Sequence, residues 1–380
     1  MTTLESGSNV THFSASKVLL LLIILVLFFV YFSQQDTYYE VRRSEFTFSE
    51  EEISVITSGG SEKRTTYLLL FLFCTILFIK NTRRLSLISN EALGFLILVN
   101  FSWAVLSFFW ADNPALTGRR IVLLSIQYFA AMSIAMNVRL RQLPTIIFWI
   151  TAPIPIIGFF SSWAHGTHPG LWWFQAADYR FYGTMHAEGQ ALNCGMLFLA
   201  AATMRENGDR LTRRLFLGVM LVAAIFLVLT KARGPFIATI IAFGVFSLCT
   251  KKRSTLVAYS FSVIVVLGVL SLVFGDALLP SLSSGMNLGR QETSGGMTGR
   301  IDLWRHLSGF VAERPVLGYG LGGFWTVDRT LAIAEFHQWR AGESHSIYVD
   351  TALDLGLIGL GIFLILVIVA WLRTWRICVN

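Results

Sequence analysis

Long apolar runs separated by short polar segments dominate the chain. A helix needs about 20 apolar residues to cross the hydrocarbon core of a bilayer. Ten runs approach that length, and the pattern predicts a membrane-spanning helix for each; they are residues 18–32, 66–79, 91–110, 121–138, 143–164, 187–204, 215–230, 235–250, 255–275 and 345–371. The first run follows Lys17 like a signal peptide but lacks a small-residue cleavage site, so we expect it to stay as an anchor.

Composition supports this interpretation. The 380 residues are 54% hydrophobic and only 14% charged, whereas soluble domains carry roughly 25% charged residues. These values exclude a disordered chain, a secreted disulfide scaffold and a soluble enzyme. The four cysteines form no CxxC pair and have no histidine at ligand spacing, so neither structural zinc nor disulfides are expected. The sequence predicts an all-α integral membrane protein.

The distribution of Lys and Arg predicts the orientation of the spans. If both termini are cytoplasmic, fifteen of these cations lie in inner segments and five in the short outer loops. Positive residues accumulate in short cytoplasmic loops, so this orientation is favoured. The net charge of +7 is explained in the same way. No nucleic acid is expected as a partner, because no basic run is interleaved with aromatics in a soluble segment.

The longest predicted outer segment, residues 276–344, lies between the last two spans. Its first part, 281–298, is rich in Gly, Ser, Met and Asn and predicts a mobile loop. Apolar residues at helical spacing then predict an amphipathic helix that ends at Pro315; they are Ile301, Leu303, Trp304, Leu307, Phe310 and Val311. We therefore expect 1–275 to hold nine spans, 276–344 to form a partly helical outer loop, and 345–380 to hold the last span.

Three short outer stretches carry groups suited to chemistry. Lys231 and Arg233 stand in a tight Gly-Pro break between two apolar runs, where they either snorkel to the interface or form an anion site. The glycine-dense stretch 318–323 is only a weak phosphate-loop signal, since glycines more often serve plain turns. His345 opens the last apolar helix and is either a solvated cap residue or a functional imidazole.

Motifs in the second half of the chain resemble a known family. His345-Ser346, nine residues and then the pair Gly356 and Gly359 resemble the C-terminal signature of the O-antigen ligase and polysaccharide polymerase superfamily. Further similar elements are Gly299-Arg300 with Trp304, Arg314-Pro315-Val316-Leu317-Gly318-Tyr319-Gly320, Lys231-Ala232-Arg233-Gly234, and Arg180 with Gly183-Thr184 and His186. The sequence departs from the family's pattern at two places. Lys231-Ala232 stands where the family usually has small polar residues, and Glu188 stands where Asn is common. The resemblance covers roughly residues 180–360. Within it, residues 314–325 resemble exopolysaccharide polymerases somewhat more than ligases.

The resemblance implies a fold and an activity. Family members have a polytopic bundle of about 10–12 transmembrane helices with a large periplasmic loop that contains amphipathic helices, similar to GT-C glycosyltransferases. They move a glycan from a polyprenyl (undecaprenyl) diphosphate carrier to an acceptor hydroxyl at the periplasmic face of the bacterial inner membrane. The transfer inverts the sugar and uses neither metal nor cofactor, and this sequence likewise has no Asp-x-Asp pair.

The resemblance also implies roles for individual residues. Arg233 and Arg300 match the family's essential arginines, and two guanidiniums can bind a diphosphate leaving group. His345 matches the family's histidine, and an imidazole can take the acceptor's proton near neutral pH or position the acceptor. Substrate-binding roles are expected for Arg180, His186, Lys231, Trp304, Arg305 and Ser346. Weaker candidates are Arg119, Arg120 and Glu343. Trp172, Trp173 and Trp325 either stack on sugar rings or lie at the membrane interface. For Asp350 and Asp354, helix packing and acceptor contact are both open.

Alternatives remain at two levels. A transporter or flippase of lipid-linked glycan would favour ionisable residues at mid-membrane and symmetric halves, and a structural assembly subunit would explain neither the outer arginines nor His345. Within the enzyme hypothesis, the acceptor is a lipid A core sugar for a ligase and a growing glycan for a polymerase. Besides donor, acceptor and membrane lipids, other polysaccharide-assembly proteins are possible partners.

Overall fold

The computed structural model describes residues 24, 27, 61–80, 92–164, 181, 183–185, 187–206, 208–250, 297–337 and 342–379. All regular structure within these ranges is helical, so the predicted all-α class is confirmed. The predicted spans 255–275 and, apart from two residues, 18–32 lie outside the described residues. So do the predicted loop 281–298, except for its last two residues, and the candidates Trp172, Trp173, Arg180 and His186.

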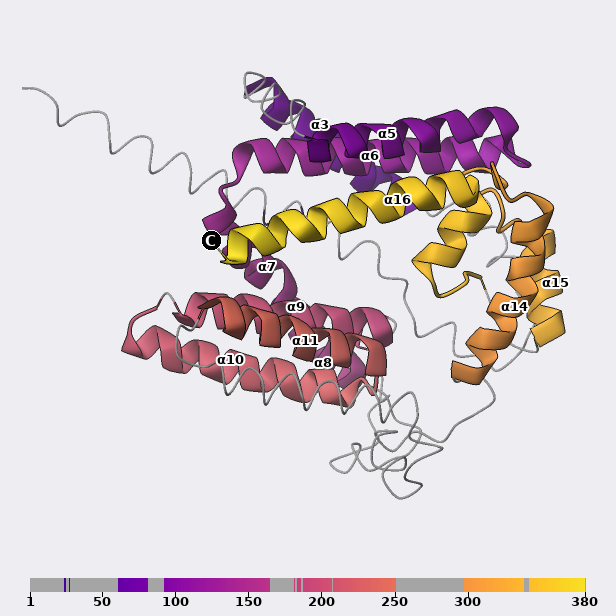
Figure 1. Ribbon diagram of the computed structural model, residues 1–380. Helices are drawn as coiled ribbons and strands as arrows, with labels where there is room; N and C mark the ends of the chain where they lie inside the picture. Colours follow the sequence, from indigo (N-terminus) through magenta and orange to yellow (C-terminus); the bar gives the residue numbers. More distant parts are fainter. Residues whose placement is uncertain are drawn as a thin grey trace, which may run out of the picture. The chain divides into compact units, whose positions relative to one another are not determined.

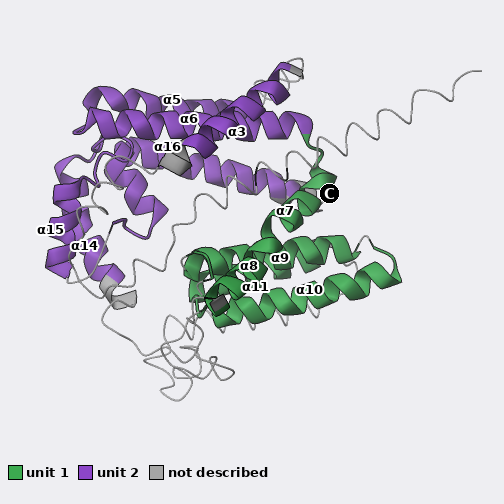
Figure 2. Ribbon diagram, turned by 180° about the vertical axis from the view of Figure 1, so that it is seen from behind, with its two compact units in different colours: residues 1–42, 138–291 green, residues 43–137, 292–380 purple. Residues whose placement is uncertain are grey.

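The chain forms two compact units, each built from two stretches of sequence (Figure 2). Unit 1 comprises residues 1–42 and 138–291 and holds η3 (Leu140–Gln142), α7 (Leu143–Thr151), α8 (Pro153–Ala164), α9 (Ala187–Glu206), α10 (Arg210–Leu229) and α11 (Arg233–Thr250). Unit 2 comprises residues 43–137 and 292–380 and holds α3 (Ser61–Lys80), α5 (Ala92–Leu106), η2 (Ser107–Trp110), α6 (Pro114–Asn137), α14 (Met297–Glu313), α15 (Val327–His337) and α16 (Ile347–Val379). The two units are defined by compactness, whereas the predicted division was made by position relative to the membrane. The structure does not test that division, which stays a prediction.

Five stretches of the described chain are long and apolar enough to cross a membrane: Ala92–Trp110, Pro114–Asn137, Leu140–Trp163, Arg210–Leu229 and Ile347–Thr374. Each coincides with a predicted span to within a few residues at most ends. Apolar segments of α3 and α11 are shorter. Helix α9 (Ala187–Glu206), which coincides with the predicted span 187–204, is not among the five. The hydropathy pattern therefore located five of the predicted spans in the described residues, and the protein is an integral membrane protein.

Helix α9 is the centre of unit 1, where it contacts α7, α8, α10 and α11. Half of its buried residues are alanines, and Cys194 and Gly195 lie among the others; such small residues let neighbouring helices approach closely. A polar contact crosses this interface. Pro155 of α8 has no N–H to donate to the carbonyl of Thr151, and the Asn193 amide donates to that carbonyl instead, at 3.1 Å. This bond explains why a break between α7 and α8 is tolerated inside one apolar span.

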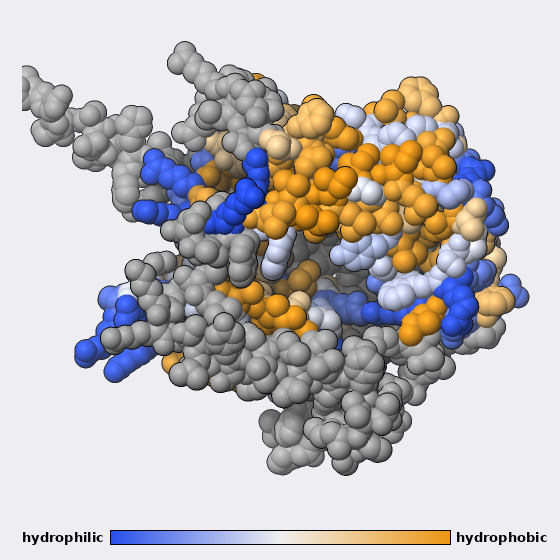
Figure 3. Space-filling view, viewed as in Figure 1, coloured by the Kyte–Doolittle hydropathy of each residue, from blue (hydrophilic) through white to orange (hydrophobic). Residues whose placement is uncertain are grey.

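Helices α5 and α6 run alongside each other in unit 2, and α16 packs against α5 (Figure 1). Their outward faces carry large apolar side chains, among them Phe95, Leu98, Val122, Ile365 and Ile368. Figure 3 shows this apolar surface over α5, α6 and α16, with hydrophilic side chains towards the end where α14 and α15 lie. An apolar exterior of this kind is what a lipid environment stabilises.

Helix α16 contains a backbone break that gives the outer end of unit 2 its shape. At Gly356 φ is 68° and ψ is −175°, which is not helical. The glycine-dense loop packs into this break, where Tyr319 N–H donates to Leu353 O and Gly320 N–H donates to Asp354 O, both at 2.8 Å. Leu357 N–H in turn donates to Pro315 O at 2.8 Å. The loop thus uses backbone groups that an unbroken helix would have paired internally.

Candidate functional site

The predicted outer ends of α5, α6 and α16 lie together in unit 2. Trp110 Nε1 donates to Leu317 O at 2.8 Å, and Leu321 N–H donates to Ser107 Oγ at 3.0 Å. Asp112 N–H donates to Tyr319 O at 3.2 Å. The glycine-dense loop therefore joins the three helix ends, as the predicted topology requires, and α14 and α15 lie side by side next to it (Figures 1 and 2).

His345 lies in a tight turn just before α16. We expected it to open the helix, but α16 begins at Ile347 and Ser346 is its cap residue, since the Ser346 carbonyl accepts from Asp350 N–H at 2.9 Å. His345 itself has a φ of 55°, in the left-handed region that non-glycine residues rarely adopt. Its Nδ1 is 3.2 Å from a carboxylate oxygen of Glu343. This contact orients the imidazole, whose side chain is 23% exposed.

The turn around His345 is held by buried polar contacts. Ser344 is fully buried; its hydroxyl donates to Ser346 O at 2.8 Å and accepts from Ser346 N–H at 3.1 Å. One oxygen of Asp350 accepts from Ser344 N–H at 3.2 Å and from the indole of Trp325 at 3.0 Å. Asp350 thereby fastens the turn to α16 on one side and, through Trp325, to the residues that follow the glycine-dense loop on the other.

Helix α14 is tied to the same turn. The indole N–H of Trp304 donates to Ser344 O at 2.8 Å, directly next to His345. Arg300 precedes Trp304 by one helical turn, so both side chains start from the same face of α14. The structure therefore brings Trp304, His345 and Ser346 together and places Arg300 on the helix face that leads to them.

The predicted helix at this place is confirmed, with one difference in its buried face. Leu303 and Leu307 are fully buried and Phe310 packs beside them, but Ile301 is 47% exposed. Arg305 lies on an exposed face of the helix and pairs with Asp302 at 2.7 Å. Its substrate-binding role stays a prediction, and an exposed i,i+3 ion pair accounts for its position in this structure.

The glycine-dense loop serves as a structural connection. Its N–H groups at 319 and 320 bond to α16 carbonyls, and Gly322 N–H donates to the carboxylate of Asp354 at 2.8 Å. A phosphate loop needs such N–H groups directed at a ligand. Because these three are occupied within the protein, the plain-turn interpretation is the one that the structure supports, and Asp354 holds the loop to α16 through one of its oxygens.

A cluster of charged and aromatic side chains braces this loop. Arg314 and Arg329 both pair with Asp112, the latter at 2.6 Å, and their guanidiniums stack over the ring of Tyr319 at 4.8 and 4.6 Å. Burial, followed by a hydrogen bond to Glu313, raises the pKa of Tyr319 to about 12, so its hydroxyl stays protonated and donates to Glu313 at 2.9 Å. Although burial opposes it, pairing with the two arginines lowers the pKa of Asp112.

Unit 1 carries the second predicted element. Lys231 is only 5% exposed and has a φ of 50°. It stands between Thr230, the C-terminal cap of α10, and Arg233, the first residue of α11. A helix N-terminus carries partial positive charge, and with a lysine and an arginine beside it the local field favours an anion. The predicted break is confirmed, while its anion-binding role stays a prediction.

A turn at 183–185 lies next to this break. Phe181 N–H donates to Leu229 O at 2.9 Å, and a side chain at Gly158 would collide with the backbone of Gly183, so the segment packs closely on α8 and α10. The side chain of Gln190, one turn into α9, is fully buried beside Gly183. Arg180 and His186 flank this turn in sequence but lie outside the described residues.

The roles of some site residues could not be predicted from the sequence, although Asp350 was itself a candidate. Ser344 and Asp350 hold the histidine turn, but a serine before a helix and an acid in its first turn are ordinary capping residues. Helix α15 was not predicted either, although Thr326 at its start and the buried set Thr330, Ile333 and Ala334 have helical spacing.

Comparison with known proteins places these elements in one family. The model of the family described as O-antigen ligase matches residues 218–364. That range contains the Lys231 break, Arg300, Trp304 and the His345 turn, and it excludes Arg180 and His186. No curated protein and no solved structure matches the chain. This match supports the predicted resemblance to the O-antigen ligase and polysaccharide polymerase superfamily, over residues 218–364 of the chain.

Proposed function

We propose that this protein transfers a glycan from a polyprenyl (undecaprenyl) diphosphate carrier to an acceptor hydroxyl at the periplasmic face of the bacterial inner membrane. The observation that carries the proposal is the His345 turn. It lies inside the O-antigen ligase match, has a rare left-handed backbone, and is held by Trp304, Trp325 and Asp350. So many contacts around the backbone that carries one titratable side chain are expected where the position of that side chain matters for chemistry.

The chemistry divides between anion binding and proton transfer. The acceptor oxygen attacks the anomeric carbon, the bond from that carbon to the diphosphate oxygen breaks, and attack from the opposite face inverts the sugar. Arg300 and Arg233 would bind the diphosphate and stabilise the charge that gathers on it as it leaves. His345 would take the proton of the acceptor hydroxyl, and Glu343 would orient its ring through Nδ1.

The remaining predicted residues would bind the substrates. Lys231 adds a second cation at the start of α11 and would contact the carrier's phosphates, as would Arg180. Trp304 offers an aromatic face to a sugar, and Ser346 lies beside the acceptor base. We propose supporting roles for Arg305 and His186. The acceptor is a lipid A core sugar if the protein is a ligase and a growing glycan if it is a polymerase.

Loss of the proposed residues should block transfer in cells. We expect Arg300→Ala and His345→Ala each to accumulate lipid-linked glycan without lowering the abundance of the protein, because both side chains lie outside the buried core. Asp328→Asn, an exposed change on α15, is the control and should leave the polysaccharide unchanged. The measurement is the ratio of carrier-linked to transferred glycan. Normal polysaccharide from both alanine variants would refute the assignment.

A further inference from the structure

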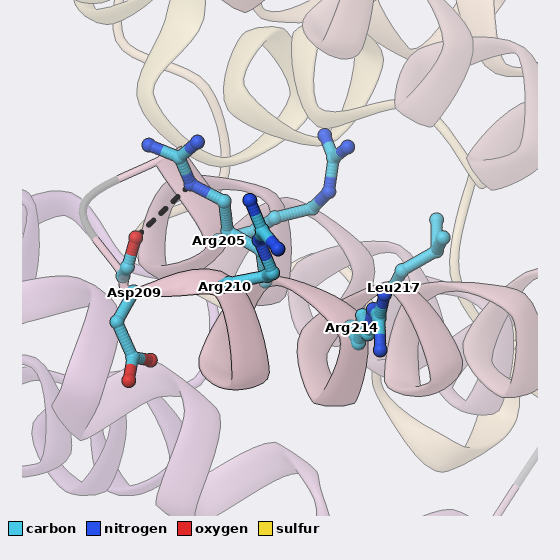
Figure 4. Close-up of a pocket in the computed structure, with 7 residues that line it drawn as sticks. Arg205, Asp209, Arg210, Arg214 and Leu217 are labelled. Atoms are coloured by element: carbon cyan, nitrogen blue, oxygen red, sulfur yellow. Dashed lines mark hydrogen bonds between the residues drawn. The ribbon is translucent and has the colours of Figure 1, made fainter.

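Four arginines gather at the turn between α9 and α10 (Figure 4). Arg205 ends α9, and Arg210, Arg213 and Arg214 lie in the first turns of α10. With Gly208, Asp209 and Leu217 they line a hollow of about 390 Å³, a volume typical of pockets that hold small ligands. We call these residues the arginine hollow. All of them belong to unit 1.

Among the described residues, two carboxylates lie at this turn, those of Glu206 and Asp209. Glu206 is 3.6 Å from Arg205. The carboxylate of Asp209 caps α10 by accepting from Thr212 N–H at 2.9 Å, and its hydrogen bonds to Thr212 lower the pKa of Asp209. Figure 4 shows that carboxylate directed away from the guanidiniums of Arg205 and Arg210. Asp209 is therefore committed to the helix end.

The guanidiniums themselves differ in what they contact. Arg213 Nε donates to Gly208 O at 3.0 Å and so closes the turn. Within the part of the chain that the structure describes, Arg210 and Arg214 have neither a hydrogen-bonding nor an ion-pairing partner, and both are exposed. These two side chains are available to a ligand without any change in the fold.

The placement of the arginines is unfavourable without an anion. The N-terminal end of a helix is partially positive, and cations there are destabilising. Arg210 and Arg214 are also four residues apart on one helix face, where like charges repel. Beyond the cap residue Asp209, the first turn of α10 has no acidic residue to offset them. A bound phosphate would relieve both penalties and accept forked hydrogen bonds from guanidinium groups.

The surroundings indicate a phosphate attached to an apolar chain. Leu211, Leu215 and Leu217, on the same two turns of α10, are 65%, 63% and 42% exposed. Helix α10 spans 20 residues, about 30 Å or one hydrocarbon thickness. The hollow thus lies at the opposite end of α10 from Lys231. We propose that the arginine hollow binds the headgroup phosphate of an anionic phospholipid in the inner leaflet, with the leucines against its acyl chains.

The proposal is tested on the purified full-length protein in nanodiscs of phosphatidylcholine with increasing phosphatidylglycerol. The unfolding temperature is followed for the wild type, for Arg210→Gln/Arg214→Gln and for the matched control Arg139→Gln/Arg141→Gln, which removes two exposed cations from another predicted inner loop. We expect phosphatidylglycerol to raise the unfolding temperature of the wild type and of the control. The apparent affinity of the Arg210/Arg214 variant for phosphatidylglycerol should be at least about tenfold weaker. Without anionic lipid, that variant should be as stable as the wild type or more so.

Two results would overturn the proposal. An equal response of the wild type and the Arg210/Arg214 variant would mean that the arginines only orient the protein during insertion. Equal stabilisation of the wild type by inorganic phosphate in phosphatidylcholine nanodiscs would mean that the hollow takes a soluble anion. Neither result depends on glycan transfer, so the test stands apart from the proposed function.

Discussion

Lys231 and His345 are the non-glycine residues of the described chain whose backbones have positive φ, at 50° and 55°. Such conformations cost of order 1–3 kcal/mol each and persist only where the surroundings impose them. The same two residues belong to the motifs that resemble the family, and both lie within the O-antigen ligase match. Backbone strain and sequence motif therefore coincide at the two turns for which we propose functional roles.

Asp350 offers a test of how the histidine turn is held. Its carboxylate accepts hydrogen bonds from Ser344 and Trp325, so what it supplies is an acceptor oxygen. We expect Asp350→Ala to lower kcat of glycan transfer about tenfold or more with little change in KM for the donor. Asp350→Asn keeps an oxygen at that position and should recover most of the activity.

Thr351→Ala is a suitable control for this pair, because the Thr351 hydroxyl is bonded only to its own helix at Ile347 O and is exposed. Steady-state kinetics on the purified protein supply the comparison. If the asparagine variant were as impaired as the alanine variant, charge rather than hydrogen bonding at Asp350 would be required, and its role as a positioning residue would have to be abandoned.

At the scale of elements, the break in α16 determines where the glycine-dense loop can sit. Gly356 has a φ of 68°, and a Cβ there would collide with the carbonyl of Val316. We expect Gly356→Ala to separate the loop from α16 and to lower both the unfolding temperature and glycan transfer. Gly361→Ala, in the same helix with open space around it, should change neither by a measurable amount. Thermal unfolding in detergent measures the difference, and equal behaviour of the two variants would contradict this account.

The sequence predicted the elements well and their long-range contacts poorly. Apolar runs gave the spans, and helical spacing with Pro315 gave α14 to within a few residues of its ends. By contrast, Gly356 lies in an apolar run whose pattern predicts one continuous helix. The break in α16 at this glycine depends on hydrogen bonds to residues about 40 positions earlier in the chain. Local patterns cannot show such pairings, and for the same reason the roles of Ser344 and Asp350 became visible only in the structure.

At the scale of the whole molecule, the two units share one organisation. In each, apolar helices expose side chains suited to lipid and bring together the ends that the charge pattern assigns to the outer side. In unit 1 these ends carry the Lys231 turn and the first residue of α11, Arg233. In unit 2 they carry the His345 turn and α14. The division of the chain into these units joins stretches far apart in sequence, which hydropathy alone does not predict.

Transfer by the reconstituted protein is the most direct test of the central claim. The full-length protein in nanodiscs is given a diphosphate-linked glycan donor and an acceptor in the presence of EDTA, and the product and the released polyprenyl diphosphate are quantified together. We predict that the wild type in EDTA releases one polyprenyl diphosphate for each glycan transferred. His345→Asn should transfer about 10²- to 10⁴-fold more slowly. Arg300→Lys and Arg233→Lys should each show a clear loss of rate, because lysine cannot form the forked hydrogen bonds of arginine to phosphate. Wild-type rates from His345→Asn, or transfer that EDTA abolishes and Mg²⁺ restores, would contradict the account.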